Sequence, residues 1–154
     1  MNGRRRSSSN NTDLALFVLR VITGVIFIAH GWQKLFILGI TGVGSAFASM
    51  GAPLPTISGP VFGAIELLAG AAIIVGLFTR LASFGLACDA AGAIIVFHSK
   101  HGFFVPMGIE FVLMLLGAAI ALWIGGAGEY SIDALLAGRR ADAAVQPTYR
   151  SQSR

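Results

Sequence analysis

Residues 57–98, ISGPVFGAIELLAGAAIIVGLFTRLASFGLACDAAGAIIVFH, contain two apolar runs that are separated by a very short turn. The first run covers about residues 57–78 and the second about 81–98, and each approaches the roughly 20 residues that a membrane-spanning helix needs. Because only Phe78, Thr79 and Arg80 form the connection, the two helices have to be antiparallel neighbours. The stretch therefore predicts a helical hairpin inside a membrane.

Two further apolar runs, about 14–36 and 104–124, flank this hairpin. Only 12% of the residues are charged and 55% are hydrophobic, whereas a soluble domain has roughly 25% charged residues. The sequence predicts an all-α integral membrane protein, a four-transmembrane-helix bundle of residues 13–137. We expect residues 1–12 to be a disordered basic segment and 138–154 a polar tail.

The connection between the first two spans predicts a short interfacial helix. Its apolar residues recur at helical spacing, at Ile40, Val43, Phe47 and Met50. Thr41 can cap this helix, and Gly51 with the prolines that follow can end it. We expect the helix to lie on the outer membrane surface and to cover the bundle.

The basic residues predict the orientation of the chain. Of the 11 Lys and Arg residues, eight lie in the two terminal segments and in the turn after the second run, at Arg4, Arg5, Arg6, Arg80, Arg139, Arg140, Arg150 and Arg154, whereas Lys34 and Lys100 lie on the opposite side. The positive-inside rule then places both termini in the cytoplasm of a multi-pass protein in a bacterial plasma membrane. Because these charges lie in loops and tails and not on one face, we expect membrane lipid and no nucleic acid as partner.

The chain has one cysteine, Cys88, inside an apolar run. One thiol cannot form an intramolecular disulfide, so a dithiol cycle carried by this chain alone is excluded. We expect Cys88 to be a buried, inert thiol.

Besides Lys34 at the end of the first run, four charged residues lie inside the spans, at Arg20, Glu66, Asp89 and Glu110. A charge costs about 2.5–3.5 kcal/mol at the centre of a membrane helix, so such residues face the bundle interior. Each of the four shares a helix face with glycines or another small residue, which mark close helix contacts. The pattern predicts a polar seam inside the bundle.

The seam has two expected parts. Glu66 and Asp89 are at similar distances from the Thr79 turn, and we expect Arg20 to reach one of them. We expect His30, Lys34 and Glu110 to gather near the outer end. Two interpretations remain open for these residues: an ion-pair network that fixes helix register, or a site for a proton, a quinone or a polar substrate.

The histidines His98 and His101 favour a solvated loop over a metal site, because no third ligand has suitable spacing. No cofactor-binding motif is evident, and a quinone is compatible with the seam.

Three segments resemble the DoxX family of small four-span bacterial membrane proteins: LRVITGVIFIAHGWQKLF (19–36), GAIELLAGAAIIVGLFTRLAS (63–83) and IEFVLMLLGAAIALWIGGAGEYSID (109–133). The positions that match are Arg20, Gly24, His30, Gly31, Lys34, Glu66, Gly70, Gly76, Thr79, Arg80, Glu110 and residues 128–133. The resemblance implies a four-helix bundle in the plasma membrane, and it does not extend to Asp89 or the 98–101 loop.

The resemblance also implies a redox role. Members of the family include subunits assigned to a thiosulfate:quinone oxidoreductase, and others are linked to sulfurtransferase and superoxide dismutase partners in thiol and oxidative stress. We therefore expect a redox-associated oxidoreductase subunit, linked to a quinone and to thiosulfate or thiols. The alternatives are a non-enzymatic scaffold that tethers soluble redox enzymes, or a small-solute permease, which would need at least a homodimer to form a path.

Overall fold

The computed structural model describes residues 3–104 and 106–139, with side chains from residue 10 onward. Its helices are α1 (Gly3–Trp32), α2 (Gly39–Ser49), α3 (Pro55–Val75), α4 (Thr79–Ala93) and α5 (Glu110–Gly125). Wider π-helical turns continue α1 through Gln33–Ile37 and α4 through Ile94–His98. Residues 132–139 form one more short helix.

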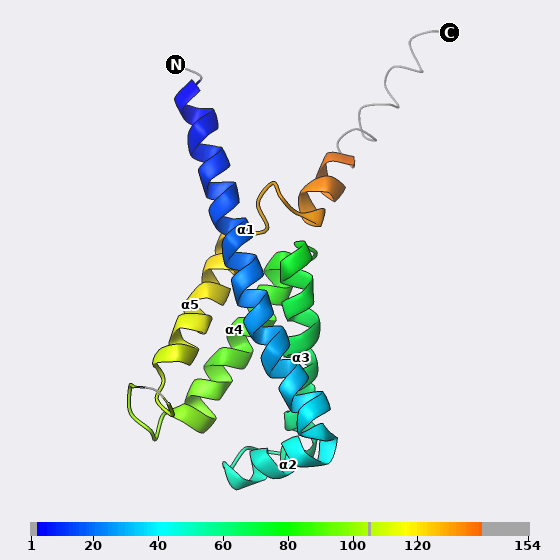
Figure 1. The fold of residues 1–154 in the computed structure, drawn as a ribbon, viewed down its shortest axis with the longest axis vertical. Helices are drawn as coiled ribbons and strands as arrows, with labels where there is room; N and C mark the ends of the chain where they lie inside the picture. The colour runs from blue at the N-terminus through cyan, green and yellow to red at the C-terminus, as the bar shows by residue number, and fades with distance from the viewer. Residues whose placement is uncertain (1–2, 105, 140–154) are drawn as a thin grey trace, which may run out of the picture.

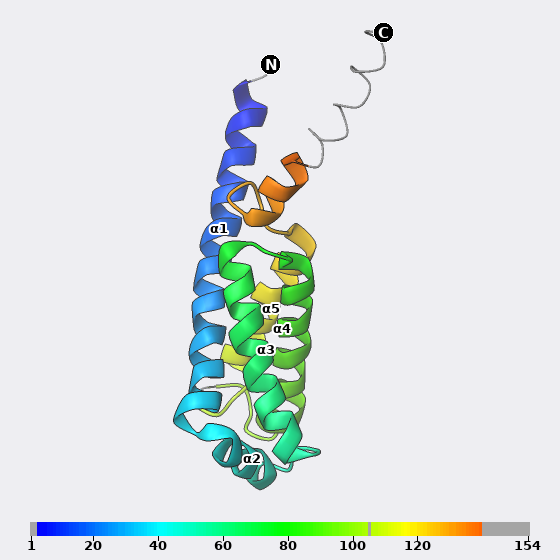
Figure 2. The same ribbon diagram turned by 90° about the vertical axis from the view of Figure 1, so that its right-hand side faces the viewer.

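Helices α1, α3, α4 and α5 form a bundle, and α2 crosses one end of it (Figures 1 and 2). We call this the α2 end. The start of α1 and the helix of residues 132–139 both lie at the opposite end, which we call the terminal end (Figure 1). Within the bundle, α1 packs mainly on α3, and α4 packs on α5 and α3. The predicted all-helical membrane fold is confirmed.

Three of the helical segments are long and apolar enough to cross a membrane: Asn10–Ile37, Pro55–Val75 and Thr79–His98. Helix α5 has 16 residues, which is about 24 Å at 1.5 Å per residue and shorter than a hydrocarbon core of about 30 Å. It begins at Glu110 and not near residue 104, because the chain around Pro106 and Gly108 forms a turn against Phe103 and Phe104. A fourth complete span therefore stays a prediction.

The N-terminal segment corrects a second expectation. Helix α1 begins at Gly3, so residues 3–12, for which the sequence predicts disorder, are helical. Adding turns to an existing helix avoids the cost of nucleation, and this segment contains no proline to stop the helix. Most of the predicted polar tail, residues 140–154, lies outside the described residues.

Helix α2 confirms the predicted amphipathic helix between the first two spans. Val43 and Phe47 are buried against the bundle, whereas Ile40 and Met50 on the same predicted stripe are exposed. Thr41 lies within the helix and is not its cap, since α2 begins at Gly39, where φ is +73°. The helix thus covers the bundle end through one half of its apolar stripe.

The glycines on the predicted faces mark a close contact between α1 and α3, and Gly59 marks another between α3 and Val43 of α2. A Cβ atom added to Gly70 would lie 3.0 Å from the Gly24 carbonyl oxygen, and one added to Gly31 would lie 2.6 Å from the Gly63 carbonyl oxygen. In contrast, a Cβ atom at Gly92 of α4 or Gly117 of α5 would meet nothing within 4 Å. The predicted close approach is therefore confirmed for the first pair of helices and is wrong for these two glycines.

Residues 128–133 form a clasp at the terminal end. The Asp133 carboxylate accepts hydrogen bonds from the backbone N–H groups of Phe78 (2.8 Å) and Thr79 (2.9 Å), at the start of α4. The Asp133 N–H donates to the Gly76 carbonyl at 2.9 Å. The clasp thereby holds the turn between α3 and α4, where Gly76 and Phe78 both have positive φ.

We expect Asp133→Ala to destabilise the protein by about 1–2 kcal/mol, the usual cost of losing a helix N-cap. Asp133→Asn keeps one acceptor oxygen and should lose less. Unfolding in detergent at increasing SDS concentration measures both variants. An unchanged midpoint for Asp133→Ala would show that the clasp does not hold the turn.

Candidate functional site

A cavity of about 720 Å³ lies inside the bundle at the α2 end. Helices α1, α3, α4 and α5 contribute to its lining, and α2 contributes Phe47 and Ser49. Most of the lining is apolar, and its aromatic side chains are Phe27, Phe47, Phe62, Phe97 and Phe111. The volume is in the range of pockets that bind small organic ligands.

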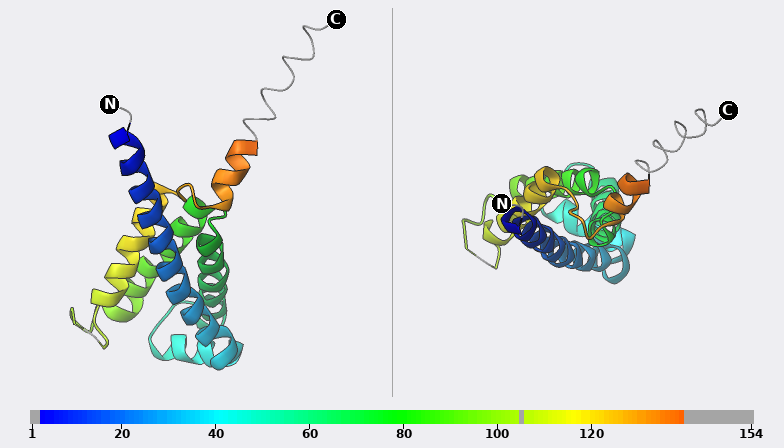
Figure 3. Two further views of the ribbon diagram at one scale, coloured as in Figure 1. Left: turned by 45° about the horizontal axis from the view of Figure 1, so that its top comes forward. Right: turned by 90° about the horizontal axis from the view of Figure 1, so that it is seen from above.

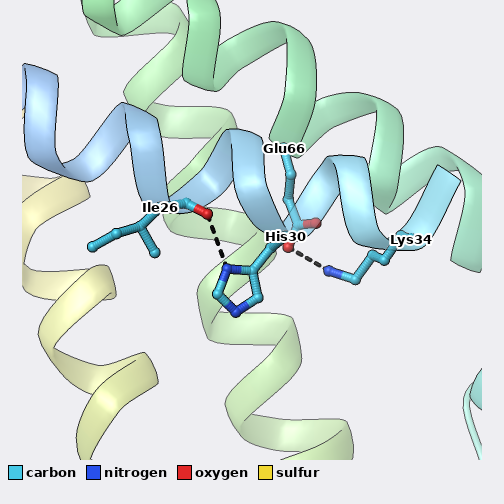
Figure 4. Close-up of polar contacts among 4 residues, drawn as sticks. All are labelled: Ile26, His30, Lys34 and Glu66. Carbon is cyan, nitrogen blue, oxygen red and sulfur yellow. Dashed lines mark hydrogen bonds and ion pairs between the residues drawn. The ribbon is translucent and has the colours of Figure 1, made fainter. Parts of the chain in front are cut away.

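Lys34 and Glu66 form an ion pair in this cavity, in which the Lys34 ammonium donates to Glu66 Oε1 (Figure 4). The pair joins α1 to α3 and is well shielded, since the side chains are 21% and 6% exposed. The other carboxylate oxygen, Glu66 Oε2, is buried and has no hydrogen-bond partner within the described residues. Buried acceptors in folded proteins nearly always have a partner, and either the carboxyl group of Asp89, which lies beside Glu66, or a ligand can supply one.

Asp89, from α4, completes the charged group. It lines the same cavity, is 6% exposed and interacts electrostatically with both Glu66 and Lys34. The prediction that Glu66 and Asp89 lie at the same height inside the bundle is confirmed. One ammonium group therefore faces two carboxyl groups in this cavity.

His30 lies one helical turn before Lys34 and lines the cavity. Its Nδ1 lies 2.9 Å from the Ile26 carbonyl oxygen (Figure 4). Because a carbonyl only accepts, Nδ1 carries the proton, and Nε2 of the neutral ring is an acceptor. The ring stacks on Phe111 of α5, with centroids 6.1 Å apart.

Two π-helical turns shape this region. Lys34 belongs to the turn that ends α1, and Phe97 and His98 belong to the turn that ends α4. All three residues line the cavity. A π-helical turn holds one more residue than an α-helical turn and often occurs at functional sites, because it redirects the side chains.

Arg20 does not reach Glu66 or Asp89, so that prediction is wrong. Its side chain is completely buried and points to the terminal end, where it donates to the carbonyl oxygens of Ile73 (3.4 Å) and Tyr130. A long basic side chain gains more from unpaired carbonyls at a helix end than from crossing an apolar layer. Arg20 therefore contacts the clasp through Tyr130 and does not line the cavity.

Glu110, the third member of the predicted cluster with His30 and Lys34, is placed differently with respect to the cavity. It begins α5, is partly buried and is not among the residues that line the cavity. The partner of Lys34 is Glu66, because the Gly31–Gly63 contact brings α1 and α3 together at this height. The structure thus divides the predicted seam into a clasp at one end and a charged cavity at the other.

Sequence reasoning missed several lining residues. His98, Lys100 and His101, which the sequence assigns to a solvated loop, line the cavity towards α2. His98 and His101 each place Nδ1 2.9 Å from a carbonyl oxygen. No group of three or more His, Cys, Asp or Glu side chains that could hold a metal ion is found within residues 3–104 and 106–139. The spacing of Asp89, Gly92 and Val96 indicates one helix face, but α-helical spacing does not place His98 on it, and His98 belongs to the π-helical turn that ends α4.

Cys88 is exposed, in contrast to the expected buried thiol. It precedes Asp89 on α4, and adjacent residues on a helix point about 100° apart. Since Asp89 faces the cavity, Cys88 is directed to the outside of the bundle.

Comparison with known proteins finds one matching family profile and several similar bacterial proteins. The DoxX family profile matches residues 15–99. The chain is 36% identical to "Putative oxidoreductase CatD" of Bacillus subtilis over 71% of this chain and 79% of that protein. It is 32% identical to "Inner membrane protein YqjF" of Escherichia coli over 80% and 93% of the two chains.

A third relative is "Uncharacterized membrane protein Rv3486" of Mycobacterium tuberculosis, which is 29% identical over 81% of this chain and 83% of that protein. No solved structure matches the chain. The matched residues 15–99 begin within α1 and end just after the π-helical turn that continues α4, and they include Lys34, Glu66 and Asp89. The hairpin, the glycine contact of α1 with α3 and these comparisons together show that the chain is a membrane protein of the DoxX family.

Proposed function

We propose that this protein is a redox-associated oxidoreductase subunit that binds the headgroup of a quinone in the cavity between Lys34, Glu66 and Asp89. The observation that carries the proposal is a charged group at one wall of a mostly apolar cavity within the membrane bundle. The relative CatD has the word oxidoreductase in its name, which supports the same class of function.

The residues present suit a quinone. A quinone takes up two electrons and two protons when it becomes a quinol. The Lys34 ammonium can donate a hydrogen bond to a quinone carbonyl oxygen, and Glu66 and Asp89 can hold the protons. His30 Nε2 can accept a hydrogen bond from a quinol hydroxyl group. The aromatic walls can pack against the flat ring.

A small anion such as thiosulfate fits the same charged group less well. Lys34 is already paired, and two carboxyl groups lie beside it, so an anion there would meet like charge. We therefore assign the cavity to the electron acceptor, and the donor is a thiol or thiosulfate that reacts elsewhere or through a partner protein. Two thiols that form one disulfide release two electrons and two protons, which balances the reduction of one quinone. Two thiosulfate ions that form one tetrathionate release two electrons and no proton, so with that donor the two protons of the quinol come from water.

The proposal includes the orientation of the chain in the membrane and its soluble partner proteins. The loop arginines favour a cytoplasmic terminal end in a bacterial plasma membrane, with the α2 end on the outer side. Soluble sulfurtransferase or superoxide dismutase partners, suggested by the family resemblance, would then reach the clasp and the tails from the cytoplasm.

Quinone binding by the purified protein in lipid nanodiscs tests the proposal. We expect saturable binding of a labelled ubiquinone analogue by the wild type. Gly92→Leu, which places a side chain into the cavity without a clash at its Cβ, should weaken this binding about tenfold or more, which is about 1.4 kcal/mol. Gly117→Leu is the matched control, since Gly117 has equal space around its Cβ and does not line the cavity.

Two outcomes would refute the assignment. The first is a wild type that binds no quinone saturably. The second is equal binding by the wild type and Gly92→Leu while both variants remain folded.

A further inference from the structure

The walls of the cavity differ in composition. Towards α2, the lining includes Ser49, Lys100 and His101, which suit contact with water and lipid headgroups. Between α1 and α5, the lining is formed by Phe27, His30, Phe111, Val112 and Leu115. The cavity thus has a mostly apolar wall between α1 and α5 and, towards α2, polar side chains among apolar ones, which we call its polar side.

Helices α1 and α5 are in contact mainly near the terminal end. A Cβ atom at Gly125 of α5 would lie 3.0 Å from the Leu16 side chain, and the Glu129 N–H donates to Asp13 at 3.1 Å. From there the two helices diverge towards the α2 end (Figures 1 and 3). At the height of the cavity, the ring contact between His30 and Phe111 bridges the space between them.

Phe111 lines the cavity and is 42% exposed. Val112, its neighbour on α5, lines the cavity but is buried at 9% exposure. Phe111 and its ring contact with His30 therefore form the part of the cavity wall that lies between the diverging helices. An aromatic side chain in such a wall can move aside by rotation without unfolding a helix.

We infer that the space between α1 and α5 is a lateral opening to the lipid, closed by the His30–Phe111 pair. The inference rests on the proposed function and specifies its substrate class. The ligand is a membrane-dissolved quinone with a long isoprenoid tail, which enters from the bilayer and leaves its tail between α1 and α5. Its headgroup lies at Lys34 and Glu66, while the polar side of the cavity stays in contact with headgroups and water.

Exchange kinetics in nanodiscs test the opening. The probes are two labelled quinones with the same headgroup, one with a long isoprenoid tail and one without a tail. Phe111→Ala removes the ring contact and should speed the exchange of the tailed quinone about threefold to tenfold. The quinone without a tail can use the polar side, so its exchange should change less. Phe84→Ala is the control, because Phe84 is similarly exposed at 45% and does not line the cavity.

Photolabelling of the wild type gives a second measurement that does not depend on the stability of a variant. A quinone with a diazirine group in its tail should label the residues of α1 and α5 around His30 and Phe111. Labelling of α2 or of residues 99–104, together with unchanged exchange in Phe111→Ala, would overturn the lateral opening. In that case quinone binding itself would still stand, whereas absence of binding by either probe would overturn the proposed function.

Discussion

Gly31→Ala is expected to destabilise the protein by about 3 kcal/mol, although it adds a single methyl group. The new Cβ atom would lie 2.6 Å from both the Gly63 carbonyl oxygen and the Leu67 backbone nitrogen of α3. Backbone atoms cannot rotate away as a side chain can, so α1 and α3 would have to separate. The separation would also weaken the packing around Gly24 and Gly70 and the Lys34–Glu66 pair.

Gly117→Ala is the matched control for this change. It adds the same methyl group to another helix, where a Cβ atom has nothing within 4 Å. Since alanine favours a helix over glycine by about 1 kcal/mol, Gly117→Ala should be as stable as the wild type or slightly more stable. Unfolding midpoints in SDS titrations compare the two variants. Equal destabilisation would show that the glycines act through helix propensity and not through close packing.

Lys34→Met is expected to cost about 3 kcal/mol, because it leaves two carboxyl groups in the cavity without their cation. Glu66 and Asp89 are 4% and 6% exposed, so water cannot replace the ammonium group easily. The loss should be measurable as a lower SDS midpoint at neutral pH.

Glu66→Gln provides the informative contrast. The amide oxygen can still accept from Lys34, and Asp89 remains as the counter-ion, so the stability should change by less than about 1 kcal/mol. Quinone reduction, in contrast, should fall roughly 100-fold, as expected when a proton-transferring group is lost. Glu66→Gln with normal reduction would favour a structural ion pair. A loss of stability as large as that of Lys34→Met would contradict the argument that Asp89 can replace Glu66 as the counter-ion of Lys34.

The membrane fold could be predicted from local features of the sequence. The apolar runs have the length of a membrane span, and the turn at Phe78–Arg80 is too short to allow anything except a hairpin. The stripe through Val43 and Phe47 predicted α2, because periodicity is a property of neighbouring residues. The predicted start of α5 was too early, because the hydropathy of the sequence does not show that a turn around Gly108 precedes the helix.

The partners of the charged residues could be predicted only in part. The sequence indicated that Arg20, Lys34, Glu66 and Asp89 face the interior, because a charge is costly in lipid. It did not indicate that Arg20 turns away from the two carboxyl groups or that Lys34 pairs with Glu66. A long side chain can extend towards either end of its helix, and the choice depends on which acceptors the neighbouring helices present.

The sequence by itself thus determined that this chain forms membrane helices with charged residues directed inward, because both follow from the cost of exposing polar groups to lipid. Only the tertiary structure decided that these residues separate into a clasp and a cavity. The close contact at Gly24 and Gly31 brings α1 onto α3, while α1 and α5 diverge at the α2 end (Figure 1). The cavity arises from that difference in helix separation, which depends on contacts between residues far apart in the chain.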